Sequence, residues 1–157
     1  MEKQNLTTGF QNVDNSQHQF LMKFLEDVLK PGGRVVIFDF DWDAMVIAHG
    51  DKALTRKIVR YASDSFPNGR VGPELFHLMR EAGFTNVRVQ PSSYSGNDRV
   101  MQDITKRVHE GILQTGVSTG VLTQTEIADW WAAFDKDVSE GNLFVSYQGF
   151  IVSGTND

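Results

Sequence analysis

The sequence predicts an α/β fold, because stretches with helical periodicity alternate along the chain with short apolar stretches typical of strands. Strands are expected over about residues 34–40, 86–90 and 143–153. The first is nearly continuously apolar, as in an inner strand that is covered on both faces. Helices join the first two strands, which favours a crossover between strands that run in the same direction. We therefore expect a small sheet with flanking helices.

The helix before the first strand is predicted from apolar residues that recur at helical spacing after the capping side chains of residues 14–16. Its expected buried face comprises Phe20, Leu21, Phe24, Leu25, Val28 and Leu29. Pro31 and the two glycines after it end this helix, because proline disfavours helical geometry in the preceding residue and glycine accepts a left-handed turn.

Further helices are predicted between the strands. One surrounds Ile58, and the next begins at Pro73 and stops at Gly83. The segment 84–91 then holds a short strand that ends at Pro91. A helix over residues 97–114 follows, and a loop is expected at 116–120. The expected apolar face of the helix over 97–114 comprises Val100, Ile104, Val108 and Ile112.

The last predicted helix is the best marked in the chain. Thr123 and Glu126 form a capping box at its start, and Gly141 ends it. Trp130 and Trp131 are adjacent, so their side chains cannot point to the same side of a helix. One is expected in the core while the other lines a pocket or an interface, and packing of the pair in the core is the alternative interpretation.

Composition restricts the class of protein. The chain has 157 residues, 40% of them hydrophobic and 22% charged, which indicates a globular chain, and we expect a single domain over residues 1–157. A net charge of −5 argues against a nucleic-acid-binding module. The absence of cysteine excludes disulfides, thiolate zinc sites and a cysteine nucleophile. No apolar run is long enough to span a membrane and no signal-peptide core begins the chain, so a cytoplasmic location is expected.

Acidic residues alternate directly after the first strand. If the strand persists, Asp39, Asp41 and Asp43 face one side at its carboxyl end, where open α/β sheets bind ligands. Together with Trp42 and His49 they are candidates for a substrate pocket. The alternative interpretation is a set of solvated residues at a strand end, some of which cap the following turn.

No metal site is predicted. A calcium loop beginning at Asp39 fails, because its sixth residue is Ala44 and its twelfth is Gly50. The four histidines show no pair at helical metal-binding spacing. His49 is the candidate general base among them, with an exposed loop histidine as the alternative interpretation. The basic residues are scattered in the sequence, which favours solvated faces over an anion site.

The order of motifs resembles a known family. Residues 24–37 contain a helix, a Leu-Lys-Pro-Gly-Gly turn and a strand that resemble a segment of class I S-adenosylmethionine-dependent methyltransferases. Residues 81–89 resemble the Glu-Ala-Gly-Phe-x-x-Val helix and strand that follow it, and residues 144–154 resemble the last, antiparallel strand of that family. Residues 11–14 resemble the segment after its fourth strand. The resemblance implies a partial Rossmann-like sheet in which the last strand lies between the other two.

This resemblance covers only the C-terminal half of the family's domain. The glycine-rich turn that lets the backbone approach the cofactor is missing, since no Gly-x-Gly occurs in the chain. The resemblance implies S-adenosylmethionine as cofactor, with Phe10 and Gln11 beside it and doubtful binding by this chain alone. It also implies a small-molecule acceptor, held by the insertion at residues 44–72 and by the helices over 97–114 and 123–138. The predicted function is therefore the substrate-side half of a methyltransferase, incomplete for catalysis alone.

Two alternatives stay open. A half-sheet leaves the strand over 34–40 with an unpaired edge, so the chain is also predicted as a non-catalytic module that forms a homodimer through this edge or by exchange of residues 6–10. The weaker alternative resembles haloacid-dehalogenase phosphatases, in which an apolar strand precedes Asp-x-Asp-x-(Thr/Val). That resemblance implies Asp39 as nucleophile and Asp41 as general acid, with Asp43 in the place of Thr or Val.

Overall fold

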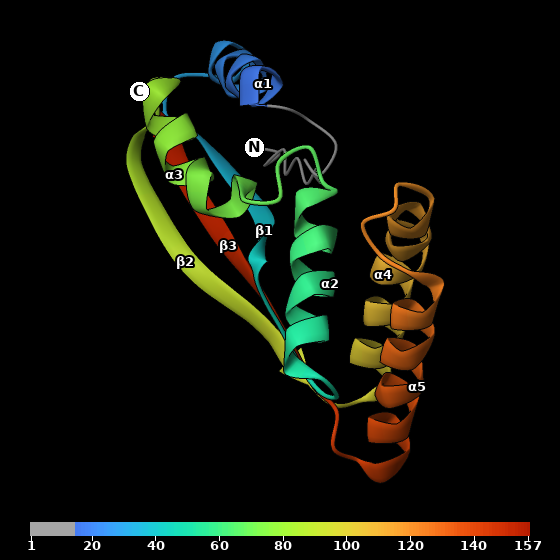
Figure 1. Cartoon of the computed structure of the whole chain (residues 1–157). Helices are drawn as coiled ribbons and strands as arrows, with labels where there is room; N and C mark the ends of the chain where they lie inside the picture. Colours follow the sequence, from blue (N-terminus) through green and yellow to red (C-terminus); the bar gives the residue numbers. More distant parts are fainter. Residues whose placement is uncertain (1–14) are drawn as a thin grey trace. The chain divides into compact units, whose positions relative to one another are not determined.

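The computed structural model describes residues 15–157 and has the α/β fold that the sequence predicts (Figure 1). Among these residues, no helix combines the length and apolar character needed to cross a bilayer. The elements in chain order are α1 (Asn15–Val28), β1 (Gly33–Ala48), α2 (Lys52–Asp64), α3 (Val71–Glu81), β2 (Thr85–Gly96), α4 (Arg99–Ser118), α5 (Gln124–Glu140) and β3 (Phe144–Asn156).

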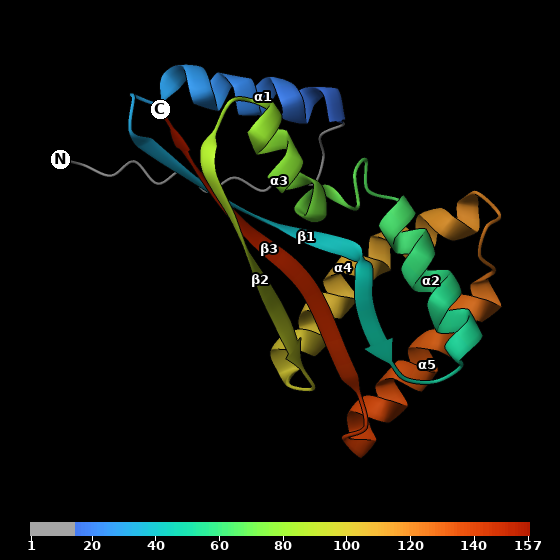
Figure 2. The ribbon, with the colours of Figure 1, turned by 90° about the vertical axis from the view of Figure 1, so that its left-hand side faces the viewer.

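The three strands form a sheet in the order β1-β3-β2. Figure 2 shows that β1 and β2 run in the same direction and that β3 runs against both. The predicted arrangement, with the last strand antiparallel between the other two, is therefore confirmed. Within the described residues β1 and β2 are the two edge strands of this sheet.

All three strands are longer than predicted, β1 and β2 by the most. β1 continues to Ala48, because Met45 and Ile47 resume the alternation of buried and exposed side chains that a strand needs. The predicted insertion at residues 44–72 therefore begins with strand, and the acidic residues lie inside β1 rather than at its end. β2 runs past Pro91 to Gly96. An edge strand tolerates a proline because its outward N–H groups need no partner in the sheet.

The chain divides into two compact units of packing, and each strand begins in one unit and ends in the other. Among the described residues, unit 1 comprises residues 15–41, 66–92 and 148–157. Unit 2 comprises residues 42–65 and 93–147.

Unit 1 has an aliphatic core between α1, α3 and the sheet. Its buried residues are Met22, Leu25, Val35, Ile37, Val71, Leu75, Leu78, Met79, Ala82, Phe84 and Val152. Gly72, in the first turn of α3, lets that helix approach β1 closely, since a Cβ there would lie 2.8 Å from the carbonyl oxygen of Phe40. Backbone contact of this kind fixes α3 against β1.

The predicted buried face of α1 is only half correct. Leu21, Leu25 and Leu29 face the core. By contrast, Phe20 and Phe24 are exposed to 74% and 51%. His18 and Met22 are completely buried as well. The buried stripe of α1 therefore begins at His18 rather than at Phe20. The exposed stripe comprises Phe20, Phe24 and Val28.

In unit 2, α2, α4 and α5 pack against one another (Figure 1). A side chain caps the start of each: Asp51 for α2, Asp98 for α4 and Thr123 for α5. The predicted capping box is confirmed, because Glu126 N–H donates to Thr123 Oγ1 and Thr123 N–H donates to a Glu126 carboxylate oxygen. Gly141 ends α5 in the left-handed conformation, with φ of 73°.

The predicted apolar face of α4 is wrong by one residue. Met101, Thr105, His109, Leu113 and Gly116 are buried, whereas Val100 and Ile104 are exposed. The helix also continues through Gly116 instead of ending before it, because Leu122 and Tyr61 pack against the bare Cα at that position. Thr105 and His109 can lie on a buried face because Thr105 Oγ1 and His109 Nδ1 bond to carbonyl oxygens of α4, and Thr105 Oγ1 also accepts a hydrogen bond from Tyr147.

Candidate functional site

A tight turn connects β1 to α2 and places one face of the helix opposite the strand. Gly50 makes this turn with φ of 52°, a left-handed conformation that favours glycine. The carboxylate of Asp51 then accepts hydrogen bonds from Ala53 N–H and Leu54 N–H at 2.7 and 2.9 Å. These bonds satisfy free N–H groups at the start of α2 and fix the direction in which the helix leaves the turn.

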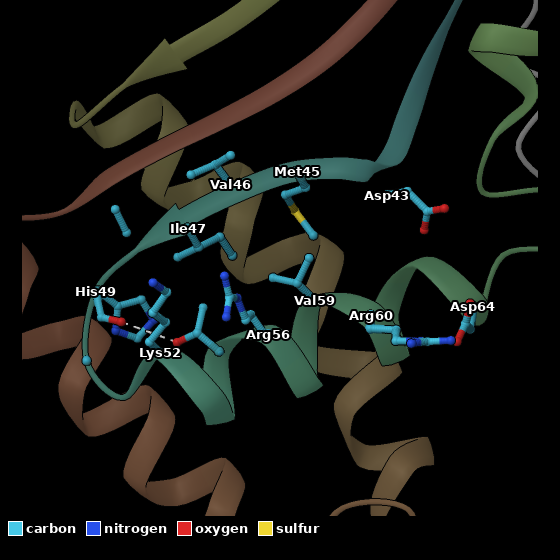
Figure 3. Close-up of a pocket in the computed structure, with 13 residues that line it drawn as sticks. Asp43, Met45, Val46, Ile47, His49, Lys52, Arg56, Val59, Arg60 and Asp64 are labelled. Carbon is cyan, nitrogen blue, oxygen red and sulfur yellow. Dashed lines mark hydrogen bonds and ion pairs between the residues drawn. The ribbon is translucent and has the colours of Figure 1, made fainter.

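The space between the second half of β1 and α2 is a pocket of about 960 Å³ (Figure 3). This volume lies at the upper end of the range found for small-molecule sites, about 300–1,000 Å³. All of its lining residues belong to unit 2. Those used below are Asp43, Met45, Ile47, His49, Lys52, Thr55, Arg56, Val59, Arg60 and Asp64.

The pocket combines apolar walls with a row of cations. Met45 and Ile47 point from β1 towards α2 in Figure 3, and Val59 of α2 faces them. Lys52, Arg56 and Arg60 follow one another every four residues along α2, so they share one face of the helix. The pocket therefore has an apolar interior with positive charge along one wall.

The charges are distributed unequally along the pocket. At one end Arg60 Nε lies 3.7 Å from Asp64 Oδ2, and Asp43 accepts a hydrogen bond from Ser63 Oγ at 2.5 Å. At the other end, neither Lys52 nor Arg56 has an ion pair with any described residue. The unpaired positive charge is concentrated towards the turn between β1 and α2.

His49 is placed at this turn, and its side chain is completely buried. The ring packs against Trp130 and Phe134, with centroids 5.0 and 5.6 Å away. Neither ring nitrogen has a hydrogen-bond partner among the described residues, and Nδ1 lies 3.8 Å from a carboxylate oxygen of Asp137. Burial lowers the pKa of His49, and the Asp137 carboxylate opposes this effect. The interpretation as an exposed loop histidine is therefore wrong, because the ring is buried against two aromatic side chains beside the pocket.

A hydrogen-bonded pair holds the wall beside His49. Trp130 Nε1–H donates to Thr55 Oγ1 at 3.1 Å, and Thr55 Oγ1–H donates to the carbonyl oxygen of His49 at 3.2 Å. Trp130 belongs to the core, as one of the two tryptophans was expected to, and half-buried Trp131 packs against it at 4.7 Å. Neither tryptophan lines the pocket.

The other predicted pocket residues lie elsewhere. Asp39 and Asp41 belong to unit 1, where Asp39 is only 2% exposed and accepts a hydrogen bond from Phe40 N–H at 2.7 Å. The prediction that the three acids share one side at the end of the strand is wrong, because the buried positions of β1 shift from Asp39 to Trp42 within it. Trp42 is buried in unit 2 against Tyr147, with ring centroids 6.0 Å apart. Of the predicted set, Asp43 and His49 line the pocket.

Some predictions fall outside the residues that the structure describes. These are the cofactor contacts of Phe10 and Gln11 and the exchange of residues 6–10. Within residues 15–157, no group of three or more His, Cys, Asp or Glu side chains is arranged to hold a metal ion.

The cations of α2 were missed by sequence analysis. Lys52, Arg56 and Arg60 are scattered in the sequence, which favoured solvated faces. Their four-residue spacing was the available signal, because it places all three on one side of any helix. What the spacing does not reveal is that β1 extends far enough to form the opposite wall.

No protein-family model matches the chain. Over 65 residues it is 38% identical to an uncharacterised 37.1 kDa protein in transposon TN4556 of Streptomyces fradiae. The match covers 41% of this chain and 19% of that protein.

Solved structures similar to this chain include two of phosphoethanolamine N-methyltransferase 2 from Haemonchus contortus. One is in complex with S-adenosylmethionine, and the other with phosphomonomethylethanolamine and S-adenosylhomocysteine. Identities are 15% and 13%, and TM-scores are 0.43 and 0.42. Each match covers 96% of this chain and 33% of the enzyme, so this chain spans a third of its length.

Proposed function

We propose that this chain is the acceptor-binding half of an S-adenosylmethionine-dependent, small-molecule methyltransferase of the cytoplasm, incomplete for catalysis alone. The observation that carries the proposal is the position of β3, antiparallel between β1 and β2. The segments whose sequences resemble class I methyltransferases form these same three strands, in the order that the resemblance implies. The pocket between β1 and α2 then supplies the space for the acceptor.

The described residues do not provide a cradle for the cofactor. A glycine-rich turn lets the backbone approach the cofactor closely, and no Gly-x-Gly occurs in the sequence. S-adenosylmethionine supplies an electrophilic methyl group when it is bound to a complete enzyme. This chain's part is to bind and orient the acceptor, which is the main task in a displacement that needs little acid–base chemistry.

Isothermal titration with S-adenosylhomocysteine tests the proposal in two arms. We expect no binding to this chain alone, because it has no Gly-x-Gly turn. We expect binding to a fusion in which the cofactor-binding half of a class I methyltransferase, ending after its fourth strand, precedes this chain. That half without this chain is the control. A folded, monomeric fusion that binds no more ligand than the control half would contradict the proposal.

A second candidate function is a non-catalytic module that forms a homodimer. Two observations favour it: β1 is an edge strand of the described sheet, and Val36 on it is 48% exposed. Unpaired strand edges with exposed apolar side chains recruit further strands. Light scattering at micromolar concentration should then show a dimer that Val36→Lys converts to a monomer. A monomeric parent chain would exclude this function.

A further inference from the structure

The cations on α2 form a local positive charge in a chain whose net charge is negative. The net charge is −5, yet the pocket wall carries three cations against the two carboxylates of Asp43 and Asp64. Both carboxylates are engaged, one with Ser63 and one with Arg60. Lys52 and Arg56 therefore remain as positive charges without a counter-ion among residues 15–157.

These two cations lie beside apolar surface rather than in open solvent alone. In Figure 3 the side chain of Arg56 extends from α2 towards β1, on the side where Ile47 and Val59 line the pocket. An anion that binds here also covers apolar wall, and removal of water strengthens its attraction to the guanidinium group. A guanidinium group donates two parallel hydrogen bonds to a carboxylate or phosphate, which gives direction as well as charge.

We propose that this pocket binds a small organic anion, with its apolar body against Met45, Ile47 and Val59 and its anionic group against Lys52 and Arg56. The anionic group is a carboxylate or a phosphate monoester, since both match the fork of Arg56. Polar acceptors without a negative charge leave both cations unpaired and bind weakly. The proposal rests on the proposed function only in so far as this anion is the methyl acceptor, because the binding itself needs no cofactor.

The pocket is also shaped before any ligand arrives. The capping bonds of Asp51 fix the start of α2, and the hydrogen bonds from Trp130 to Thr55 and from Thr55 to His49 join α2, α5 and the end of β1. Lys57 Nζ adds an ion pair with Glu126 of α5 at 2.6 Å. A preformed pocket loses less conformational freedom on binding, which favours recognition of a small ligand.

Binding of three phenyl compounds to the full chain tests the proposal by two-dimensional NMR titration. Phenylacetate and phenyl phosphate present the two anionic groups, and phenylacetamide has the same body without charge. We expect at least one anion to shift amide signals of residues 45–60, and to bind about tenfold or more tightly than phenylacetamide. Binding of one anion alone identifies its group as the one recognised. Higher salt should weaken the binding, because the cations are partly exposed to water.

The matched variants are Arg56→Gln and Arg107→Gln. Arg107 is an exposed residue of α4 outside the pocket, so its variant controls for the loss of one positive charge. Arg56→Gln should weaken anion binding about tenfold, and Arg107→Gln should leave it unchanged. Equal loss in both variants, equal affinity for phenylacetamide, or no binding at millimolar concentration would overturn the proposal. None of these results involves S-adenosylhomocysteine, so they leave the proposed function to its own test.

Discussion

The two units use different means to build their structure. Unit 1 has a mainly aliphatic core, and its helix α3 begins at Val71 without a capping hydrogen bond from the side chain of Arg70. Unit 2 has capped helices and a core rich in aromatic and polar side chains. Some of its buried polar groups bond to one another: Tyr147 Oη–H donates to Thr105 Oγ1 at 2.9 Å, and Thr105 Oγ1–H donates to a backbone carbonyl.

This difference predicts which kinds of change lower the stability of each unit. Unit 1 depends on close packing of helix against strand, so added volume should destabilise it. Unit 2 depends on buried hydrogen bonds and aromatic contacts. Truncation of its buried side chains and protonation of its buried histidines should therefore destabilise it. It is also unit 2, with its polar interior, that contains the pocket.

The largest effect is expected from Trp130→Ala. Trp130 is 1% exposed, contacts His49 and Phe134, and bonds to Thr55. Removal of a buried tryptophan costs about 3–5 kcal/mol of unfolding free energy. Urea denaturation should show this loss, with a smaller one for half-buried Trp131→Ala. A larger loss for Trp131→Ala would contradict the assignment of Trp130 as the core residue.

The second-largest effect is expected from Gly72→Ala, which tests the packing of α3 against β1 in unit 1. A Cβ at Gly72 would lie 2.8 Å from Phe40 O and 2.9 Å from Asp39 O, and backbone atoms cannot move aside easily. Gly72→Ala should therefore lower the unfolding free energy by about 2 kcal/mol. In unit 2 a Cβ at Gly116 meets only side chains, at 2.8 and 2.9 Å, so Gly116→Ala should cost less.

A matched control exists for the two glycine variants. Gly111 lies on α4 with no atom within 4 Å of an added Cβ, so Gly111→Ala should raise the unfolding free energy by up to about 1 kcal/mol. The comparison between units fails if Gly116→Ala destabilises the protein more than Gly72→Ala in thermal or urea denaturation.

Acid should destabilise unit 2 through His109. Burial lowers the pKa of His109 to about 4, although a hydrogen bond to Thr105 O opposes this. The unfolded imidazole titrates near about 6.5, so the unfolded state binds more protons between these values. Stability is complete above this window and decreases as the pH falls through it. Between pH 7.5 and 5 the loss should be about 2 kcal/mol.

Urea denaturation at these two pH values measures that loss. His109→Gln should reduce the difference between them, whereas His77→Gln should leave it unchanged, since the His77 side chain is 75% exposed on α3. An equal pH effect in His109→Gln would assign the acid sensitivity to other groups, among which buried His49 is the next candidate.

The smallest effect concerns the cap of α5. Thr123 Oγ1 accepts a hydrogen bond from Glu126 N–H at 3.1 Å, and Thr123→Ala removes it. The expected loss is about 1 kcal/mol of unfolding free energy. Thr123→Ser keeps the hydroxyl group and serves as the control in thermal denaturation. A loss of the same size in both variants would mean that the cap contributes nothing.

Local signals in the sequence were the reliable ones. The capping box at Thr123 and Glu126 and the end of α5 at Gly141 were predicted correctly. The order of the three strands was also correct, but it came from the family resemblance and not from a local signal. The buried face of α4 was not, because Thr105 and His109 are polar residue types, and their hydrogen bonds to Tyr147 and to the helix backbone cannot be seen in the sequence. For the site, His49 and Asp43 were predicted to line a pocket, whereas Arg56 was not.

By itself, the sequence determined where helices and strands begin, because caps, glycines and apolar periodicity act within a few residues of one another. Only the tertiary structure decided which residues those elements bury and which charges they bring together. Asp39 is buried and Arg56 faces a pocket for reasons that lie on other elements: α3 approaches β1 at Gly72, and β1 continues to Ala48 opposite α2. Local spacing places residues on one face of a helix or strand, but which element covers that face depends on distances between residues far apart in the chain.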